Sequence, residues 1–121
     1  MFGSIVVGTD GSDAANEAVR QGVELAKAVG AELLFVSASE DAAPLLSDAA
    51  ATAQAAGVPA QTFPRPGDPA DAILDVAEER DADLIMVGHK GTSGAKRFLL
   101  GSVPNRVSHH APCSVLIIRT S

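Results

Sequence analysis

Aromatic side chains are nearly missing from this sequence, which has no tryptophan, no tyrosine and only four phenylalanines among its 121 residues. A hydrophobic core must therefore be assembled from aliphatic side chains, as in α/β proteins whose parallel sheet is covered on both faces. The length suits one ordinary domain and is too short for two. We expect a single domain over residues 1–121.

Cysteine and long apolar runs are also scarce. Cys113 is the only cysteine, so the chain can form no internal disulfide and lacks the cysteine sets that hold structural metal ions. No apolar run approaches the roughly 20 residues that are needed to span a bilayer. We therefore expect a cytoplasmic protein without a membrane partner.

Acidic residues are absent from the last third of the chain. All 15 Asp and Glu residues lie before Leu84, together with four basic residues, whereas five basic residues and no acidic ones follow. The acidic part argues against a nucleic-acid partner. The basic part is where an anionic ligand is expected to bind, although a basic face exposed only to solvent is the alternative.

Short apolar segments alternate with segments of helical periodicity along the chain. This alternation predicts right-handed crossovers and a parallel sheet with helices on both faces. The segment 60–63 is the weakest strand because Pro64 and Pro66 follow it, which suits a sheet edge. Strands are expected at 4–8, 33–36, 60–63, 84–87 and 114–119, and helices at 13–29, 41–56, 69–79 and 103–110.

Two predicted strand ends carry residues that suit ligand binding. The first strand is followed by TDGS at 9–12, and the fourth by GHKGTSGAKRFLLGS at 88–102. A glycine-rich, basic loop before a helix can hold phosphate, because its N–H groups donate and the helix dipole favours negative charge. In open α/β sheets, ligands bind beyond the carboxyl ends of the strands. Neither the G-x-x-x-x-G-K-[ST] loop nor G-x-G-x-x-G after the first strand is present.

The glycines of the second segment have a distinctive spacing. Gly88, Gly91, Gly101 and Ser102 form a G-x2-G-x9-G-S pattern, which resembles the nucleotide-binding motif of the universal stress protein family. VVGTDGS, GAELL, DADLIMVG and LLGSVPNRVSHHAPCSVLII resemble the same family in the same order. The resemblance covers nearly the whole chain and is weakest over residues 39–66. It implies a five-stranded parallel sheet of order 3-2-1-4-5, in an adenine-nucleotide alpha-hydrolase-like fold.

The resemblance also implies an adenine-nucleotide site between the ends of the first, second and fourth strands. Asp10 would bind the ribose or help to hold a magnesium ion. Lys90, Lys96 and Arg97 are added from their charge and proximity alone. The residues that match the family's positions are Gly8, Thr9, Asp10, Val36, Val87 and Gly88 for the nucleoside, and Gly91, Gly101, Ser102 and Val103 for the phosphates.

The identity of the nucleotide depends on a departure from the family pattern. The residue after Gly101-Ser102-Val103 is often a small hydroxyl residue that can contact phosphate, but here it is Pro104. Proline has neither a hydroxyl nor an N–H group, so one donor is lost. The GSVP run resembles a branch of the family that prefers cyclic AMP, whose single phosphate needs fewer donors. We expect ATP first, with cyclic AMP close behind.

No combination of residues in this sequence indicates a catalytic centre. The favoured function is therefore a nucleotide-binding sensor or regulator in a stress response. A slow ATPase or phosphotransferase that uses Asp10 and magnesium is one alternative, and a ligand-free dimeric scaffold is another.

The last predicted strand, Ser114–Arg119, is apolar and carries no proline. In the strand order of the family it lies at a sheet edge, where unprotected strands invite pairing. Family members dimerise by pairing this strand antiparallel with its twin, so we expect a homodimer.

Overall fold

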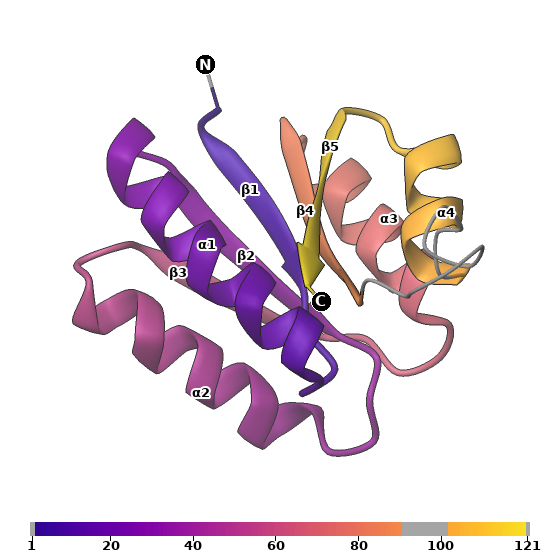
Figure 1. The fold of residues 1–121 in the computed structure, drawn as a ribbon, viewed down its shortest axis with the longest axis horizontal. Helices are drawn as coiled ribbons and strands as arrows, with labels where there is room; N and C mark the ends of the chain where they lie inside the picture. Colours follow the sequence, from indigo (N-terminus) through magenta and orange to yellow (C-terminus); the bar gives the residue numbers. More distant parts are fainter. Residues whose placement is uncertain (1, 91–101, 121) are drawn as a thin grey trace.

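The carboxyl ends of five parallel strands share one edge in the computed structural model, which describes residues 2–90 and 102–120. The strand order is β3-β2-β1-β4-β5 and every pairing is parallel. The predicted fold class and strand order are confirmed (Figure 1). The elements are β1 (Ser4–Gly8), α1 (Asp13–Val29), β2 (Glu32–Ser37), α2 (Ala42–Ala55), β3 (Ala60–Pro64), α3 (Pro69–Glu79), β4 (Leu84–Lys90), α4 (Ser102–His110) and β5 (Ser114–Thr120).

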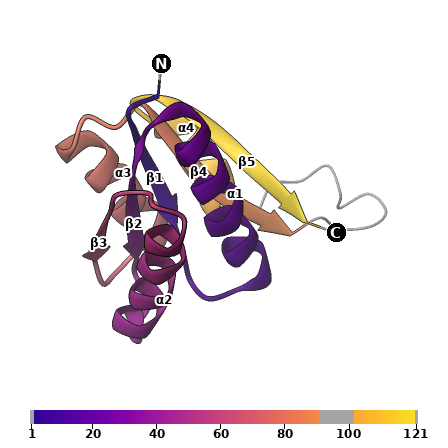
Figure 2. The ribbon, with the colours of Figure 1, turned by 90° about the vertical axis from the view of Figure 1, so that its left-hand side faces the viewer.

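Two aliphatic layers cover the two faces of the sheet. Successive strand residues point to opposite faces, so Ile5 and Val7 of β1 pack with α1 and α2, whereas Val6 packs with α3 and α4. All three side chains are completely buried. Figure 2 shows the sheet between these two helical layers. The core therefore needs no large aromatic residues, as the composition predicts.

The fourth strand is longer than the sequence predicts. β4 continues past Val87 to Lys90, because the ladder with β5 runs to the pair Lys90↔Thr120. Glycine and lysine have low strand propensity, but pairing with an apolar neighbouring strand overrides that preference. The first three residues of the predicted loop are thus part of the sheet.

A carboxylate ties the beginning of β1 to the beginning of β4. Asp83 accepts N–H bonds from Gly3 and Ser4, at distances of 2.9 to 3.2 Å. These backbone hydrogen bonds lower the pKa of Asp83. Among residues 2–90 and 102–120, no helix is both long and apolar enough to cross a membrane.

Gly88 lies where the first turn of α1 crosses β4. A Cβ atom added to Gly88 would collide with the backbone carbonyl of Ala14 and would lie 2.9 Å from the backbone nitrogen of Ala15. Neither atom can move without shifting the helix. The absence of a side chain at position 88 therefore allows α1 to pack directly on the sheet.

We predict that Gly88→Ala destabilises the fold by about 1–3 kcal/mol, the usual cost of inserting a methyl group where no space exists. Gly3→Ala is the matched control, because a Cβ atom there would meet nothing closer than an Asp83 oxygen at 3.9 Å. Urea unfolding of both variants measures the difference. Equal stabilities would mean that α1 does not require a glycine at this position.

Candidate functional site

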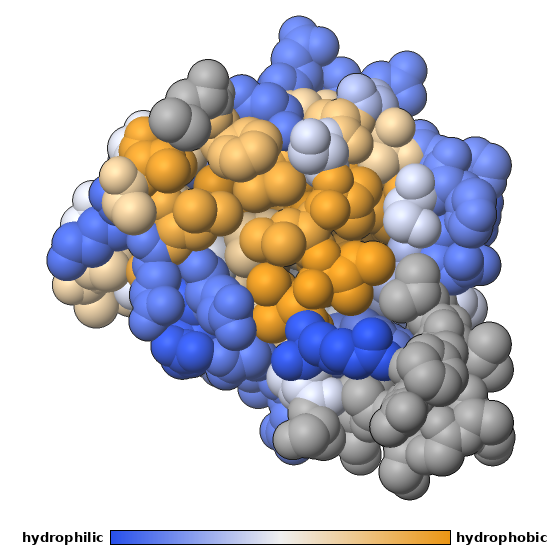
Figure 3. Space-filling view, turned by 45° about the horizontal axis from the view of Figure 1, so that its top comes forward, coloured by the Kyte–Doolittle hydropathy of each residue, from blue (hydrophilic) through white to orange (hydrophobic). Residues whose placement is uncertain are grey.

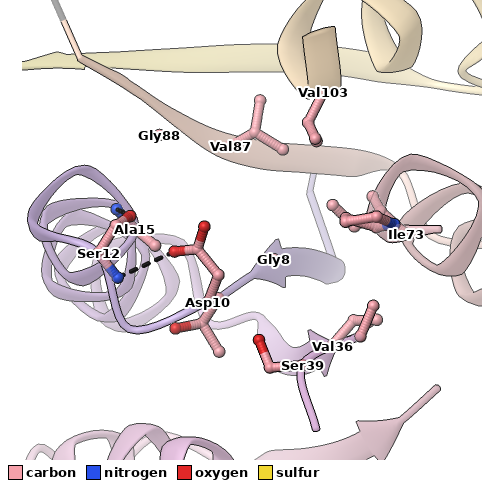
Figure 4. Close-up of a pocket in the computed structure, with 13 residues that line it drawn as sticks. Gly8, Asp10, Ser12, Ala15, Val36, Ser39, Ile73, Val87, Gly88 and Val103 are labelled. Carbon is pink, nitrogen blue, oxygen red and sulfur yellow. Dashed lines mark hydrogen bonds between the residues drawn. The ribbon is translucent and has the colours of Figure 1, made fainter. Parts of the chain in front are cut away.

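A cavity of about 120 Å³ opens at the carboxyl edge of the sheet, between the ends of β1, β2 and β4 and the first turns of α1, α3 and α4. Figure 4 shows residues from all of these elements around one space. The cavity is lined by Gly8, Thr9, Asp10, Ser12, Ala15, Val36, Ala38, Ser39, Pro69, Ile73, Val87, Gly88 and Val103.

The structure brings together most of the residues that were assigned to the nucleotide from sequence. Ser102 begins α4 beside the lining residue Val103, and Lys90 ends β4. Gly91, Lys96, Arg97 and Gly101 lie outside the described residues. The predicted residues that line the cavity are Gly8, Thr9, Asp10, Val36, Val87, Gly88 and Val103.

Sequence reasoning missed six lining residues that come from helix starts and from the short β2–α2 connection. Periodicity placed Ile73 on the inner face of its helix but could not show that this part of the face reaches the cavity. Only four residues, 38–41, connect β2 to α2. Two of them, Ala38 and Ser39, form the wall beside β2, and both have small side chains. The missed residues are Ser12, Ala15, Ala38, Ser39, Pro69 and Ile73.

Four aliphatic side chains from different elements form the apolar walls of the cavity. Val36 comes from β2, Ile73 from α3, Val87 from β4 and Val103 from α4. The first three are 1%, 4% and 3% exposed, so they are also part of the core. Apolar walls with a few polar groups at the rim are typical of sites that bind an organic ring.

Thr9 contributes its backbone to this cavity, since strand alternation turns its side chain to the opposite face from Gly8. The space above Gly8 is occupied by Ile73 of α3, which lies on the cavity side of the sheet. Thr9 also lines a groove between α1 and α2, together with Arg20 and Leu45. Its N–H group donates to the carbonyl of Val36 at 2.9 Å, which holds the ends of β1 and β2 together.

Asp10 is the only carboxylate among the lining residues that the structure describes. One carboxylate oxygen accepts the N–H of Ser12 at 2.9 Å and closes the turn that leads into α1. Figure 4 shows the other oxygen turned toward the cavity. Asp10 therefore has a structural role and can still accept a hydrogen bond from a ligand.

Asp10 is also the one lining carboxylate of the described residues that could bind a magnesium ion. Among residues 2–90 and 102–120 there is no group of three or more His, Cys, Asp or Glu side chains that could hold a metal ion. Protein-bound Mg²⁺ commonly uses one or two carboxylates together with substrate phosphates and waters. The site thus fits magnesium only when a ligand with several phosphates supplies the other oxygens.

In the described part of the chain four helices begin at this edge, and three of them, α1, α3 and α4, contribute residues to the cavity or to its caps. Ser12 caps α1 by accepting the N–H of Ala15 at 3.2 Å, and Asp68 caps α3 by accepting that of Asp71 at 2.9 Å. Both first turns also contain an acidic residue, whereas that of α4 contains none. The beginning of α4 is therefore the better place for a bound anion.

Arg106 connects α4 to α3 beside the cavity. Its guanidinium lies 3.0 Å from a carboxylate oxygen of Asp68 and 2.5 Å from one of Asp71. All three side chains are about half exposed, so these ion pairs contribute little to stability. The two ion pairs nevertheless engage Arg106, which is one of the basic residues that the charge pattern placed near an anionic ligand.

Comparison with known proteins gives a consistent result. The chain matches the model of the universal stress protein family over residues 1–55 and 37–119. It is 33% identical to universal stress protein YxiE of Bacillus subtilis, over 98% of this chain and 100% of that protein. It is 38% identical to universal stress protein Rv1636 of Mycobacterium tuberculosis, over 99% and 98% of the two chains.

A solved structure resembles this fold over nearly its full length. The crystal structure of a universal stress protein in complex with cAMP has a TM-score of 0.81 and 37% sequence identity. The match covers 99% of this chain and 98% of that chain. The family resemblance that the glycine spacing indicated is confirmed.

We predict that Asp10→Ala lowers the free energy of unfolding by about 1 kcal/mol, because it removes the acceptor for the Ser12 N–H. Asp10→Asn should lose less, since asparagine retains an oxygen for this turn. Urea unfolding of the two variants and the wild type tests this. An equal loss in both variants would assign the effect to the charge rather than to the hydrogen bond.

Proposed function

This chain belongs to the universal stress protein family, and we propose that it binds an adenine nucleotide as a regulator in a stress response. The observation that supports this function best is the arrangement of the cavity. Aliphatic walls face one another, Asp10 stands at the rim, and α4 begins at the cavity with no acidic residue in its first turn. The related structure at 37% identity is a complex with cAMP.

The cavity offers a place for each part of such a ligand. The base packs between the aliphatic walls, and a ribose hydroxyl donates to the second oxygen of Asp10. The phosphate lies at the start of α4, near Ser102 and Val103. Gly91 and Gly101, which the motif assigns to the phosphates, complete the site in this proposal.

Two nucleotides compete for this site. The sequence, with Pro104 taken into account, ranks ATP first and cyclic AMP close behind, with magnesium bound through Asp10 and the phosphates of ATP. Pro104 is the third residue of α4 and is buried, so the positive end of this helix has one N–H group fewer. A single phosphate needs fewer donors, and the related structure contains cAMP. The position of Pro104 inside α4 and the related complex with cAMP reverse that order, and we rank cyclic AMP first and ATP second.

We predict that Val103→Asp weakens nucleotide binding at least tenfold, because a carboxylate at the start of α4 repels the phosphate. The fold should be retained, since an acidic residue in the first turn of a helix is favourable. Asn105→Asp is the matched control: it adds the same charge to the same turn, but Asn105 is exposed and does not line the cavity. Calorimetric titration of both variants with cyclic AMP and with ATP measures the affinities.

Several outcomes would change the proposed function. If the wild type binds neither nucleotide at millimolar concentration, where binding is worth only about 4 kcal/mol, the ligand-free scaffold replaces the sensor. If Val103→Asp and Asn105→Asp bind equally well, the phosphate does not lie at α4. Steady-state phosphate release that is lost in Asp10→Ala would indicate a slow ATPase.

A second part of the proposal concerns self-association through β5. Leu116 is 41% exposed and is the one large hydrophobic side chain with this much exposure in the described part of the chain. Figure 3 shows hydrophobic side chains gathered over this strand and the surface next to it. β5 is also an edge strand, and exposed apolar edges favour strand pairing. We propose a homodimer formed by antiparallel pairing of Ser114–Arg119.

We predict that Leu116→Lys shifts the protein from dimer to monomer, because the pairing would bring two lysines into an apolar interface. Thr62→Lys is the control, since Thr62 is exposed on β3, at the opposite edge of the sheet. Sedimentation velocity at several protein concentrations distinguishes the dimer from the monomer in both variants. A wild type that sediments as a monomer throughout would contradict this interface.

A further inference from the structure

Ile73 lines the cavity from α3 and is not part of the family motif. It lies on the inner face of α3, is 4% exposed, and belongs to the hydrophobic cluster between the sheet, α3 and α4. Figure 4 shows it pointing into the cavity from the side opposite Asp10 and Ser12.

The end of the Ile73 side chain stands directly above the last residue of β1. A Cβ atom added to Gly8 would lie 2.5 Å from Cδ1 of Ile73 and 3.1 Å from its Cγ1. Ile73 therefore fills the space that a side chain at position 8 would occupy. The backbone of β1 at Gly8 forms the floor of the cavity. The terminal carbons of Ile73 form the wall next to it.

The other apolar walls have much less freedom to move. Val36 and Val87 are on strands inside the sheet, paired on both sides, and their β-branched side chains end at Cγ. Val103 is in the first turn of α4, and its short side chain is β-branched, so its rotamers are restricted. Ile73 differs because its terminal carbon can rotate about χ2. The size of the space for a base depends most directly on this one side chain.

We propose that Ile73 is a specificity-determining residue that sets how large a base the cavity accepts. This inference rests on the proposed nucleotide function and adds which substituted adenines the cavity excludes. The wild type accepts an unsubstituted adenine and excludes adenines that carry a bulky apolar group on the edge facing α3. Shortening Ile73 removes that exclusion and weakens the packing on the natural base.

The experiment measures affinities for cyclic AMP and for analogues with a benzyl-type group at N6, C2 or C8. Ile73→Ala should bind cyclic AMP about tenfold more weakly, as expected when apolar contacts in a pocket are deleted. It should bind at least one analogue about tenfold more tightly than the wild type does. Ile73→Val should change both affinities in the same directions by smaller factors, and it retains the fold if Ile73→Ala does not.

Val76→Ala is the matched control. Val76 lies one turn farther along α3, is completely buried and belongs to the same cluster, but it does not line the cavity. It should destabilise the protein without changing the ratio of analogue affinity to cyclic AMP affinity. That ratio is independent of the folded fraction, because partial unfolding weakens both apparent affinities equally.

Two failures are distinguishable. If the wild type binds neither cyclic AMP nor ATP, the proposed function itself is wrong. If the wild type binds a nucleotide but the affinity ratios of Ile73→Val and Ile73→Ala match that of Val76→Ala, then Ile73 does not determine base size. A ratio that changes only in the Ile73 variants supports the inference.

Discussion

The parallel pairing of β1 with β4 is the arrangement on which the rest of the molecule depends. These strands are adjacent in the sheet through the pairs Ile5↔Leu84, Val6↔Ile85 and Val7↔Met86. α1 follows β1 on one face of the sheet and α4 follows β4 on the other face, and the strand order reverses between β1 and β4. A reversal of this kind leaves space beyond the strand ends, and the cavity lies there. The cavity therefore follows from topology, and its chemistry follows from the residues at that edge.

Much of this arrangement could be predicted because it is local in the sequence. Ser12 and Asp68 each stand directly before a helical segment, the usual place of a capping residue, and both accept an N–H bond from the first turn of their helix. Ile73 was identifiable as a core residue by periodicity. Its position at the cavity was not predictable, because that depends on how α3 crosses the sheet. The pairing of Arg106 with Asp68 and Asp71 joins residues 38 and 35 positions apart, for which sequence spacing gave no indication.

The polar groups at the cavity serve the fold before they serve a ligand. Asp10 closes a turn, Ser12 and Asp68 cap helices, and Asp68 also pairs with Arg106. Among the residues that the structure describes, what is left for a ligand is one oxygen of Asp10, the hydroxyl of Ser39, the backbone at the strand ends and the beginning of α4. This distribution explains why the motif looks weak when each residue is taken alone. A site built mainly from backbone and helix ends has few diagnostic side chains.

The contact between Gly88 and the first turn of α1 bears on how the glycine motif is interpreted in other sequences. The backbone of Ala14 and Ala15 excludes any side chain at position 88, whether or not a nucleotide is bound. Selection for this packing alone would retain the first glycine in relatives that have lost their ligand. A glycine at this position is thus a marker of the fold, and only the later positions of the motif can report on binding.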